Sequence, residues 1–278
     1  MTGSPVPHSE GESRLRPPGD AATTRALGNV PPRAAQPHRR VVTLTANWEV
    51  GPSIHVLTFT LPPDDPMEFV PGQYVTFYLV RDGKPVTRSY SIYSSAHLHD
   101  RFSLLVKRVP NGFASNLLCD LTPPAGVTET ILAPLGKFLY RDPEDRRVLM
   151  VATGVGLAPF VPMLERLHER SPSTDAWLIW GNRYVGDMVG RGELEALAAS
   201  WPSFHFVPVL SRPPTDGSWT GAVGHVQDAV RAGFPDLARA DVYLCGATPM
   251  VNEMQDLAIE LRCPKEHVFV DRWGEHAE

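Results

Sequence analysis

The sequence predicts a two-domain fold, in which an antiparallel β-barrel domain is followed by an α/β domain with a doubly wound parallel sheet. From Val41 to about Tyr140, short β-branched and aromatic runs alternate with turns, as in a closed antiparallel barrel. From Arg147 onward, apolar strands alternate with helical segments, which indicates βαβ units. We therefore expect a barrel domain at residues 41–142 and an α/β domain at residues 143–278.

Residues 1–40 come first, and we expect them to form a disordered tail rich in proline, alanine and arginine. The segment holds seven prolines and six arginines against three acidic residues, and it contains no Phe, Tyr, Trp or Ile. It cannot bury enough apolar surface to offset its ordering entropy. Because the whole chain carries a net charge of −5, the tail carries about +3 and the rest about −8. An acidic body does not favour nucleic-acid binding.

The overall composition is that of a soluble globular protein, with 42% hydrophobic and 21% charged residues. No apolar run is long enough for a transmembrane helix, and the N-terminus lacks the apolar core of a secretory signal. Cys119, Cys245 and Cys263 are too few for a disulfide framework, and they lack the clustered spacing of an iron–sulfur site. We expect a cytoplasmic monomer with no bound metal and no membrane insertion.

The barrel region carries the motif Arg88-Ser89-Tyr90-Ser91. The Arg and the Tyr lie one residue apart, so their side chains share one face of a strand. A guanidinium beside an aromatic plane suits a flat ring joined to a phosphate. An ordinary pair on a β surface would have the same spacing, so this motif alone leaves both interpretations open.

A second motif, Gly112-Phe113-Ala114-Ser115, follows about two dozen residues later. Its glycine lets backbone N–H groups and the serine hydroxyl approach phosphate oxygens without a Cβ in the way. The alternating segment Arg101–Lys107 between the motifs predicts a half-buried strand. Together the two motifs favour a bound cofactor over a plain β surface.

The α/β region opens with an apolar strand at residues 147–152, the turn Thr153-Gly154-Val155-Gly156-Leu157-Ala158-Pro159, and a helix at residues 161–170. A strand, a glycine turn and a helix N-terminus form an anion site, because unpaired N–H groups and the helix dipole point outward. A later apolar strand, residues 241–246, ends at Cys245-Gly246 and continues to Met250.

These motifs, in this order over roughly residues 41–275, resemble those of the ferredoxin–NADP reductase superfamily. A C-terminal acidic residue followed by an aromatic one, here Asp271 and Trp273, extends the resemblance. It implies an FAD-binding barrel and an NAD(P)-binding α/β domain. It also implies an oxidoreductase that passes hydride from NAD(P)H to FAD, and then single electrons to a separate ferredoxin or flavodoxin-like acceptor protein.

The resemblance further implies roles for individual residues. The catalytic set is Ser91, Cys245 and Asp271, with the carboxylate placed to relay protons. In the first domain the implied cofactor contacts are Arg88, Ser89, Tyr90, Ser91, Leu105, Val106, Lys107, Gly112, Ala114 and Ser115. In the second they are Thr153, Gly154, Gly156, Ala158, Pro159, Arg183, Ser211, Arg212, Cys245, Gly246, Met250 and Trp273. Whether Trp273 stacks on the flavin or closes the core stays open, since five residues follow it.

The choice between NADPH and NADH depends on positive side chains that would meet a 2′-phosphate. Ser211-Arg212 resembles the Ser-Arg pair of NADPH-using relatives, and this favours NADPH. Ala222 stands where some phosphate-binding relatives carry a second Arg, so NADH stays open as the alternative.

Three other functions stay open at this stage. The chain could be the reductase component of a multi-protein oxygenase, or a flavin subunit of a larger redox complex without turnover of its own. The lack of a cysteine cluster counts against the second of these. A ferric or free-flavin reductase is the third alternative, and the phosphate-binding segment Gly112–Ser115 argues against it by favouring retained FAD.

Overall fold

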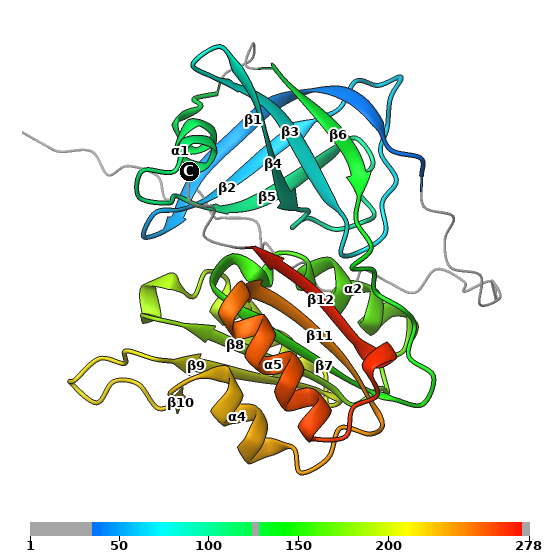
Figure 1. The fold of residues 1–278 in the computed structure, drawn as a ribbon, viewed down its shortest axis with the longest axis vertical. Helices are drawn as coiled ribbons and strands as arrows, with labels where there is room; N and C mark the ends of the chain where they lie inside the picture. Colours follow the sequence, from blue (N-terminus) through cyan, green and yellow to red (C-terminus); the bar gives the residue numbers. More distant parts are fainter. Residues whose placement is uncertain (1–34, 124–127, 274–278) are drawn as a thin grey trace, which may run out of the picture.

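The computed structural model describes residues 35–123 and 128–273, which form two six-stranded sheets, one in each half of the molecule (Figure 1). Most of the predicted tail, residues 1–34, lies outside the described residues. The strands of the first sheet are β1 (His38–Gly51), β2 (Ile54–Thr60), β3 (Tyr74–Arg81), β4 (Lys84–Ser91), β5 (Arg101–Lys107) and β6 (Thr128–Leu135).

The first sheet curls into the predicted antiparallel barrel. Its strand order is β4-β3-β6-β1-β2-β5, and the two outer strands approach each other at a bridge between Ile92 and Leu104. Inward-facing aromatic rings fill the centre, with Phe59 5.4 Å from Phe77 and 5.5 Å from Phe102 between ring centroids. Alternation of buried and exposed positions along β3 follows from the period of two in a strand.

The barrel begins earlier than the sequence indicated, because β1 starts at His38 instead of residue 41. Arg39 and Arg40 therefore belong to the barrel and not to the tail. The Arg40 side chain is buried and forms an ion pair with Asp65, and it also donates to the carbonyl of Ala133 at 3.5 Å. An arginine can be buried in a strand when its charge is paired and hydrogen-bonded. The positive charge of Arg40 alone made it look like part of the basic tail.

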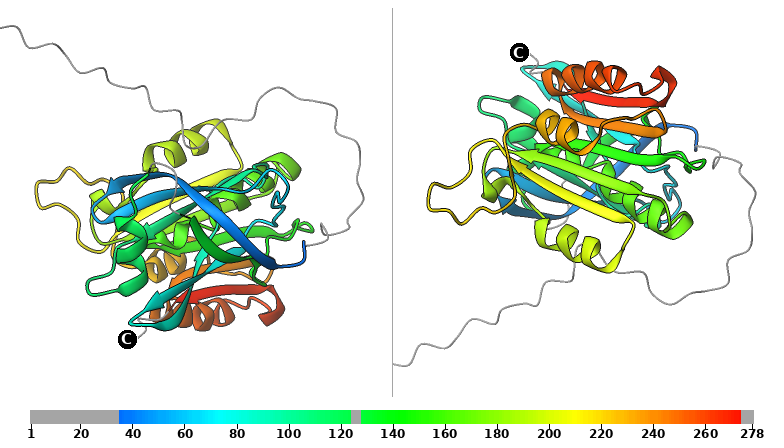
Figure 2. Two further views of the ribbon diagram at one scale, coloured as in Figure 1. Left: turned by 90° about the horizontal axis from the view of Figure 1, so that it is seen from above. Right: turned by 90° about the horizontal axis from the view of Figure 1, so that it is seen from below.

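The second sheet is fully parallel, with the order β10-β9-β8-β7-β11-β12. Figure 2 shows helices on both of its faces, α2 and α3 on one and α4 and α5 on the other. The predicted two-domain fold class is confirmed.

The strands of the second sheet are β7 (Arg147–Thr153), β8 (Ala176–Asn182), β9 (Phe204–Leu210), β10 (Ala222–Val223), β11 (Ala240–Ala247) and β12 (Val268–Trp273). The helices are α2 (Phe160–Arg170), α3 (Arg191–Ser200), α4 (Val226–Gly233) and α5 (Thr248–Glu260), with α1 (Phe113–Asp120) in the barrel domain.

One apolar cluster crosses from the barrel into the α/β domain. Ile54, Tyr93 and Leu105 of the barrel side pack in the same buried cluster as Trp180 and Met188. The ion pair between Lys107 Nζ and Asp187 Oδ1, at 3.0 Å, also joins the two domains. Apolar packing and an ion pair thus both hold the barrel against the α/β domain.

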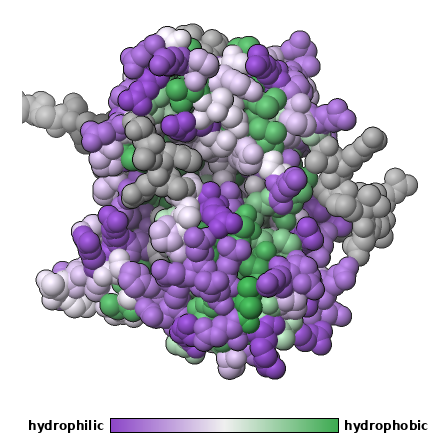
Figure 3. Space-filling model, in the orientation of Figure 1, coloured by the Kyte–Doolittle hydropathy of each residue, from purple (hydrophilic) through white to green (hydrophobic). Residues whose placement is uncertain are grey.

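Hydrophilic residues cover most of the face seen in Figure 3, and hydrophobic residues appear on it in scattered strips. Within residues 35–123 and 128–273, no helix has the length and apolar character needed to cross a bilayer.

Candidate functional site

The motif Arg88-Ser89-Tyr90-Ser91 forms the end of β4, at the rim of the barrel. The Tyr90 ring meets Phe77 edge-on at 5.9 Å, and burial raises the pKa of its hydroxyl. The Arg88 guanidinium donates to the carbonyl of Thr87 at 2.9 Å, and among the described residues no carboxylate pairs with it. This leaves a guanidinium available for an anion beside a partly buried aromatic ring.

The second motif begins α1, with Gly112 as the residue that precedes the helix. A Cβ on Gly112 would lie 2.9 Å from both Ser115 Oγ and Val109 Cβ, so only glycine fits without a shift. Ser115 Oγ accepts a hydrogen bond from the Val109 N–H at 3.1 Å, which keeps the serine hydrogen free to donate. Unpaired N–H groups at the helix N-terminus and a free hydroxyl hydrogen suit phosphate oxygens.

The two motifs are neighbours in the barrel. Tyr90 and Phe113 both pack against the same buried cluster, and the Arg81 guanidinium lies 5.6 Å from the centroid of the Phe113 ring. The site fits FAD, because it offers an available guanidinium, a partly buried aromatic ring and a close backbone approach that a Cβ would fill. Arg88, Tyr90, Gly112 and Ser115 are the residues that would hold it.

Strand β5 is the last strand of its sheet, and its residues 105–107 lie beyond the bridge between Ile92 and Leu104 that joins it to the segment after β4. The side chains of Leu105 and Val106 are buried, so only their backbone groups are available to a cofactor. The side chain of Lys107 reaches Asp187 in the other domain. The resemblance implied backbone contacts from these three residues, and their placement on an outer strand is compatible with that role.

In the α/β domain, the carboxyl ends of β7 and β11 lie side by side at the point where the strand order reverses. Ligands of such sheets bind at this point. A Cβ on Gly156 would lie 2.4 Å from the carbonyl oxygen of Cys245, and one on Gly246 would lie 2.3 Å from Thr153 Oγ1. Both glycines are therefore needed for the close approach of the two strand ends.

The three residues predicted as catalytic come together at the boundary between the domains. Ser91 Oγ donates to Asp271 Oδ2 at 3.3 Å, and Cys245 Sγ donates to the same oxygen at 3.9 Å. Cys245 and Asp271 stand opposite each other in the parallel ladder of β11 and β12, whereas Ser91 comes from the barrel. In Figure 1 the tip of β12 ends at this boundary.

Burial dominates the electrostatics of this cluster. It raises the pKa of the Asp271 carboxyl, and the hydrogen bonds from Ser91 and Cys245 offset that effect in part. It also raises the pKa of the Cys245 thiol, with the nearby Asp271 charge acting in the same direction. A carboxyl with a raised pKa keeps its proton to a higher pH than an exposed aspartate does, which suits a group that takes up and releases protons.

Replacing Asp271 with asparagine should change the pH dependence of stability. The folded-state pKa of Asp271 lies above its ordinary value of 3.8, so ionisation costs folding free energy as pH rises from 3.8 through the folded pKa. The variant keeps an acceptor for Ser91 and loses this cost. Above that window the variant should be more stable than the parent, and the difference should grow as pH rises through the window. Denaturant unfolding of both proteins between pH 4 and pH 8 measures this, and parallel curves would contradict it.

Trp273 lies over the glycine turn. A Cβ on Gly156 would lie 2.9 Å from Trp273 Cη2, and the Trp273 residue is 37% exposed. The ring thus lies beside the glycine turn that follows β7 and outside the buried core. Its stacking on a flavin stays a prediction.

The predicted coenzyme residues after β8 and β9 form a second group at the same edge of the sheet. The Ser211 N–H donates to the Asn182 carbonyl at 3.0 Å, and the Arg212 N–H donates to the Arg183 carbonyl at 3.0 Å. These bonds hold the two segments side by side. Tyr184 is not among the residues predicted from the sequence, and its hydroxyl accepts a hydrogen bond from Arg212 Nη1 at 3.1 Å. The signal that the sequence offered was the position of this tyrosine directly after Arg183.

The remaining predicted residues support the site mainly through packing. Ser89 Oγ lies 2.9 Å from Thr76 Oγ1 on the outer face of the barrel. Ala114 and Ala158 are buried, Gly154 precedes α2 in a tight turn, Pro159 directly precedes the helix, and Met250 is buried at the start of α5 beside Gly246.

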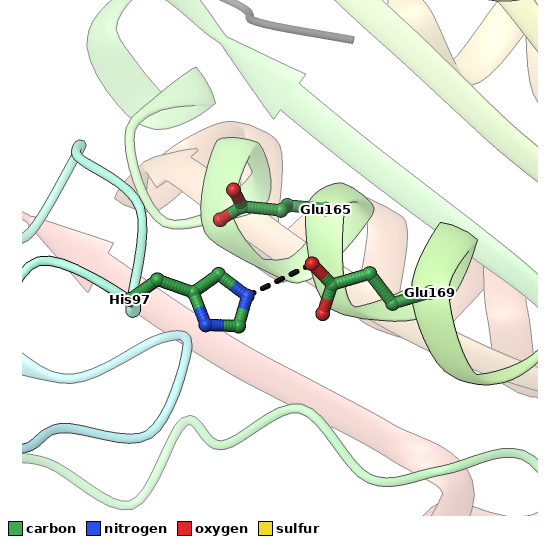
Figure 4. Close-up of side chains that lie close together, drawn as sticks. All are labelled: His97, Glu165 and Glu169. Carbon is green, nitrogen blue, oxygen red and sulfur yellow. Dashed lines mark hydrogen bonds and ion pairs between the residues drawn. The ribbon is translucent and has the colours of Figure 1, made fainter. Parts of the chain in front are cut away.

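A further charged cluster joins the domains away from the cofactor motifs (Figure 4). His97 Nε2 lies 2.8 Å from Glu169 Oε1 of α2, and one ligand atom from each of His97, Glu165 and Glu169 lies within 4.8 Å of the others. Glu165 is also hydrogen-bonded to Ser95 and to the backbone of Ala96, and burial raises its pKa. The three side chains have their partners within the protein. They connect the loop between β4 and β5, which carries His97, to helix α2.

Comparison with known proteins agrees with this geometry. Residues 41–140 match the oxidoreductase FAD-binding domain family, and residues 150–256 match the oxidoreductase NAD-binding domain family. Ferredoxin–NADP reductase B of Sorangium cellulosum is 35% identical over 238 residues, which span 83% of this chain and 96% of that protein. A glycine betaine monooxygenase reductase subunit of Chromohalobacter salexigens is 30% identical over 85% of this chain and 63% of its own length.

Solved structures share the same two-domain arrangement. The Amycolatopsis cytochrome P450 reductase GcoB superposes with a TM-score of 0.78 at 25% identity, over 86% of this chain and 70% of that one. A ferredoxin NADP+ reductase from Neisseria gonorrhoeae with bound FAD and NADP gives 0.67 at 18% identity, over 85% of this chain and 98% of that one. The predicted cofactors, FAD and NAD(P)H, are confirmed by the two domain families. With both domains matched in order and a relative covered almost end to end, the chain belongs to the ferredoxin–NADP reductase superfamily of FAD- and NAD(P)H-dependent oxidoreductases.

Proposed function

We propose that this oxidoreductase takes electrons from NADPH and delivers them singly to a separate ferredoxin or flavodoxin-like protein. The observation that carries the proposal is the convergence of Ser91, Cys245 and Asp271 where the FAD-binding barrel meets the coenzyme-binding sheet. When bound, FAD supplies the exchange between the two-electron chemistry of NADPH and one-electron transfer.

The chain's own residues position the reactants and handle the proton. Ser91 donates a hydrogen bond to Asp271 and thereby orients that carboxyl at the domain boundary. Asp271, with its raised pKa, takes up or releases the proton that accompanies electron transfer. The buried Cys245 thiol fills the end of β11, where it would help to position the nicotinamide ring for hydride transfer when both cofactors are bound.

The spectrum of the purified protein tests this function. We expect a yellow protein with about one FAD per chain and no iron, reduced by NADPH and reoxidised by a ferredoxin or flavodoxin. A colourless protein that takes up no added FAD would contradict the proposal. FMN in place of FAD would remove the adenine-binding part of it.

A second candidate function is the reductase component of an oxygenase. Relatives named as a monooxygenase reductase subunit and a cytochrome P450 reductase favour it. The two candidates differ in the acceptor, so rates of reduction of a small ferredoxin and of an oxygenase component, measured side by side, distinguish them. In either case we propose a cytoplasmic monomer.

Replacing Arg212 with alanine tests the choice of NADPH. The Arg212 guanidinium is exposed at the sheet edge, and a 2′-phosphate would form a charge-assisted pair with it, whereas NADH offers only a neutral hydroxyl there. KM for NADPH should rise roughly 10- to 100-fold and KM for NADH should hardly change. Equal losses with both coenzymes would show that Arg212 supports the loop. A parent enzyme that prefers NADH would overturn the NADPH assignment alone.

A further inference from the structure

Tyr184 lies where the two coenzyme-binding segments meet. It follows β8 in an exposed segment, and the Tyr184 residue is 50% exposed, so its ring and hydroxyl are open to a ligand at this edge of the sheet. Its hydroxyl accepts a hydrogen bond from Arg212 Nη1 at 3.1 Å, and the Arg212 guanidinium carbon lies 6.0 Å from the ring centroid. Tyr184 therefore contacts Arg212 through both its polar and its aromatic parts.

The backbone around this pair is held firmly. The Arg212 N–H donates to the Arg183 carbonyl at 3.0 Å, and the Asp187 N–H donates to the Tyr184 carbonyl at 3.1 Å. The first bond ties the two segments together, and the second closes a turn just after Tyr184. Because both partners sit on fixed backbone, the hydroxyl of Tyr184 restricts the positions open to a long and otherwise mobile arginine side chain.

The residue before this segment gives an independent sign that a ligand belongs at this edge. Asn182 is only 8% exposed, and neither its Oδ1 nor its Nδ2 has a hydrogen-bond partner among the described residues. Buried amides without partners are rare, and they are found where a structure awaits a water or a ligand. Asn182 ends β8 at the carboxyl edge of the parallel sheet, where such sheets bind their ligands.

We propose that Tyr184 is a specificity-determining residue, which positions Arg212 to receive the 2′-phosphate of NADPH. The inference rests on the proposed use of NADPH and adds to it a residue that acts through the arginine. With Tyr184 in place, the guanidinium is oriented before the coenzyme arrives, so less conformational freedom is lost on binding. NADH gains nothing from this arrangement, because its 2′-hydroxyl carries no charge for the guanidinium to meet.

The test is a double-mutant cycle in the FAD-loaded enzyme, with Tyr184→Phe, Arg212→Ala and both together. Tyr184→Phe keeps the ring and removes the hydroxyl, and it should raise KM for NADPH about 3- to 10-fold at unchanged kcat. KM for NADH should stay the same. In the Arg212→Ala background, Tyr184→Phe should have no further effect, because the interaction it removes is already absent.

Tyr78→Phe is the matched control, since Tyr78 also has an arginine over its ring, Arg39 at 4.6 Å, but lies on the barrel. It should leave both coenzymes unaffected. A Tyr184→Phe variant with parental KM for NADPH, or additive losses in the cycle, would overturn the inference. A parent enzyme reduced by neither coenzyme would overturn the proposed function instead. A parent that prefers NADH, with Tyr184→Phe still weakening NADPH alone, would support the inference and remove only the NADPH assignment.

Discussion

Replacing Arg88 with alanine is expected to lower FAD affinity by about 1.5–3 kcal/mol, roughly 10- to 150-fold. The Arg88 guanidinium is half-buried on the rim of the barrel and is bound only to the neighbouring Thr87 carbonyl among the described residues. A phosphate oxygen would be its charged partner, and alanine removes that charge-assisted bond. Titration of the apoprotein with FAD, followed by quenching of flavin fluorescence, measures the loss.

Arg101→Ala is the control for that experiment. Arg101 is an exposed arginine of β5, and it pairs with Asp100 at 3.5 Å. A general effect of charge would weaken FAD binding in both variants, whereas a specific phosphate contact affects Arg88→Ala alone. Unchanged affinity in Arg88→Ala would assign Arg88 to the ordinary surface of the barrel.

Replacing Cys245 with alanine is expected to slow flavin reduction by NADPH roughly 10- to 100-fold while FAD content stays intact. Cys245 is fully buried at the end of β11, on the coenzyme side of the domain boundary, and none of the FAD motifs contains it. A group that acts in the aligned complex should lower kcat more than it raises KM. Stopped-flow measurement of flavin bleaching gives the rate directly.

Cys263→Ala separates this role from the loss of a buried thiol. Cys263 is also buried, and its thiol donates to the Ala240 carbonyl at 3.5 Å, at the opposite end of β11. It should cost stability without changing the reduction rate. If Cys245→Ala reduces its flavin at the parental rate, Cys245 is a packing residue like Cys263.

Much of the fold could be predicted from the sequence, because long apolar runs have clear periodicity. Residues 147–152 and 241–246 were expected as strands, and they lie within β7 and β11. The two-residue strand β10 could not be predicted, since two residues have no measurable period. The start of β1 was misplaced because Arg40 resembles the basic tail in composition, and only its tertiary ion pair with Asp65 explains its burial.

Only part of the candidate site could be predicted from the sequence. Cys245 and Asp271 end neighbouring parallel strands, a relation that alternating strands and helices make predictable. Ser91 lies 180 positions before Asp271, in a domain of another class, and only the family resemblance joined them. Lys107 and Asp187 lie 80 positions apart, and nothing in the sequence predicts that they form an ion pair. In the sequence each of them looks like an ordinary charged residue of the surface.

The apolar cluster shared by the two domains has a consequence for how such reductases diversify. Barrel residues such as Ile54 and Leu105 and sheet residues such as Trp180 bury one another. Each domain alone would therefore expose an apolar face that the other domain covers. A chimera that took only its barrel from a relative would pair two faces shaped against different partners, leaving gaps or clashes. New acceptors are therefore more readily accommodated by changes in exposed segments around the rim than by exchange of whole domains.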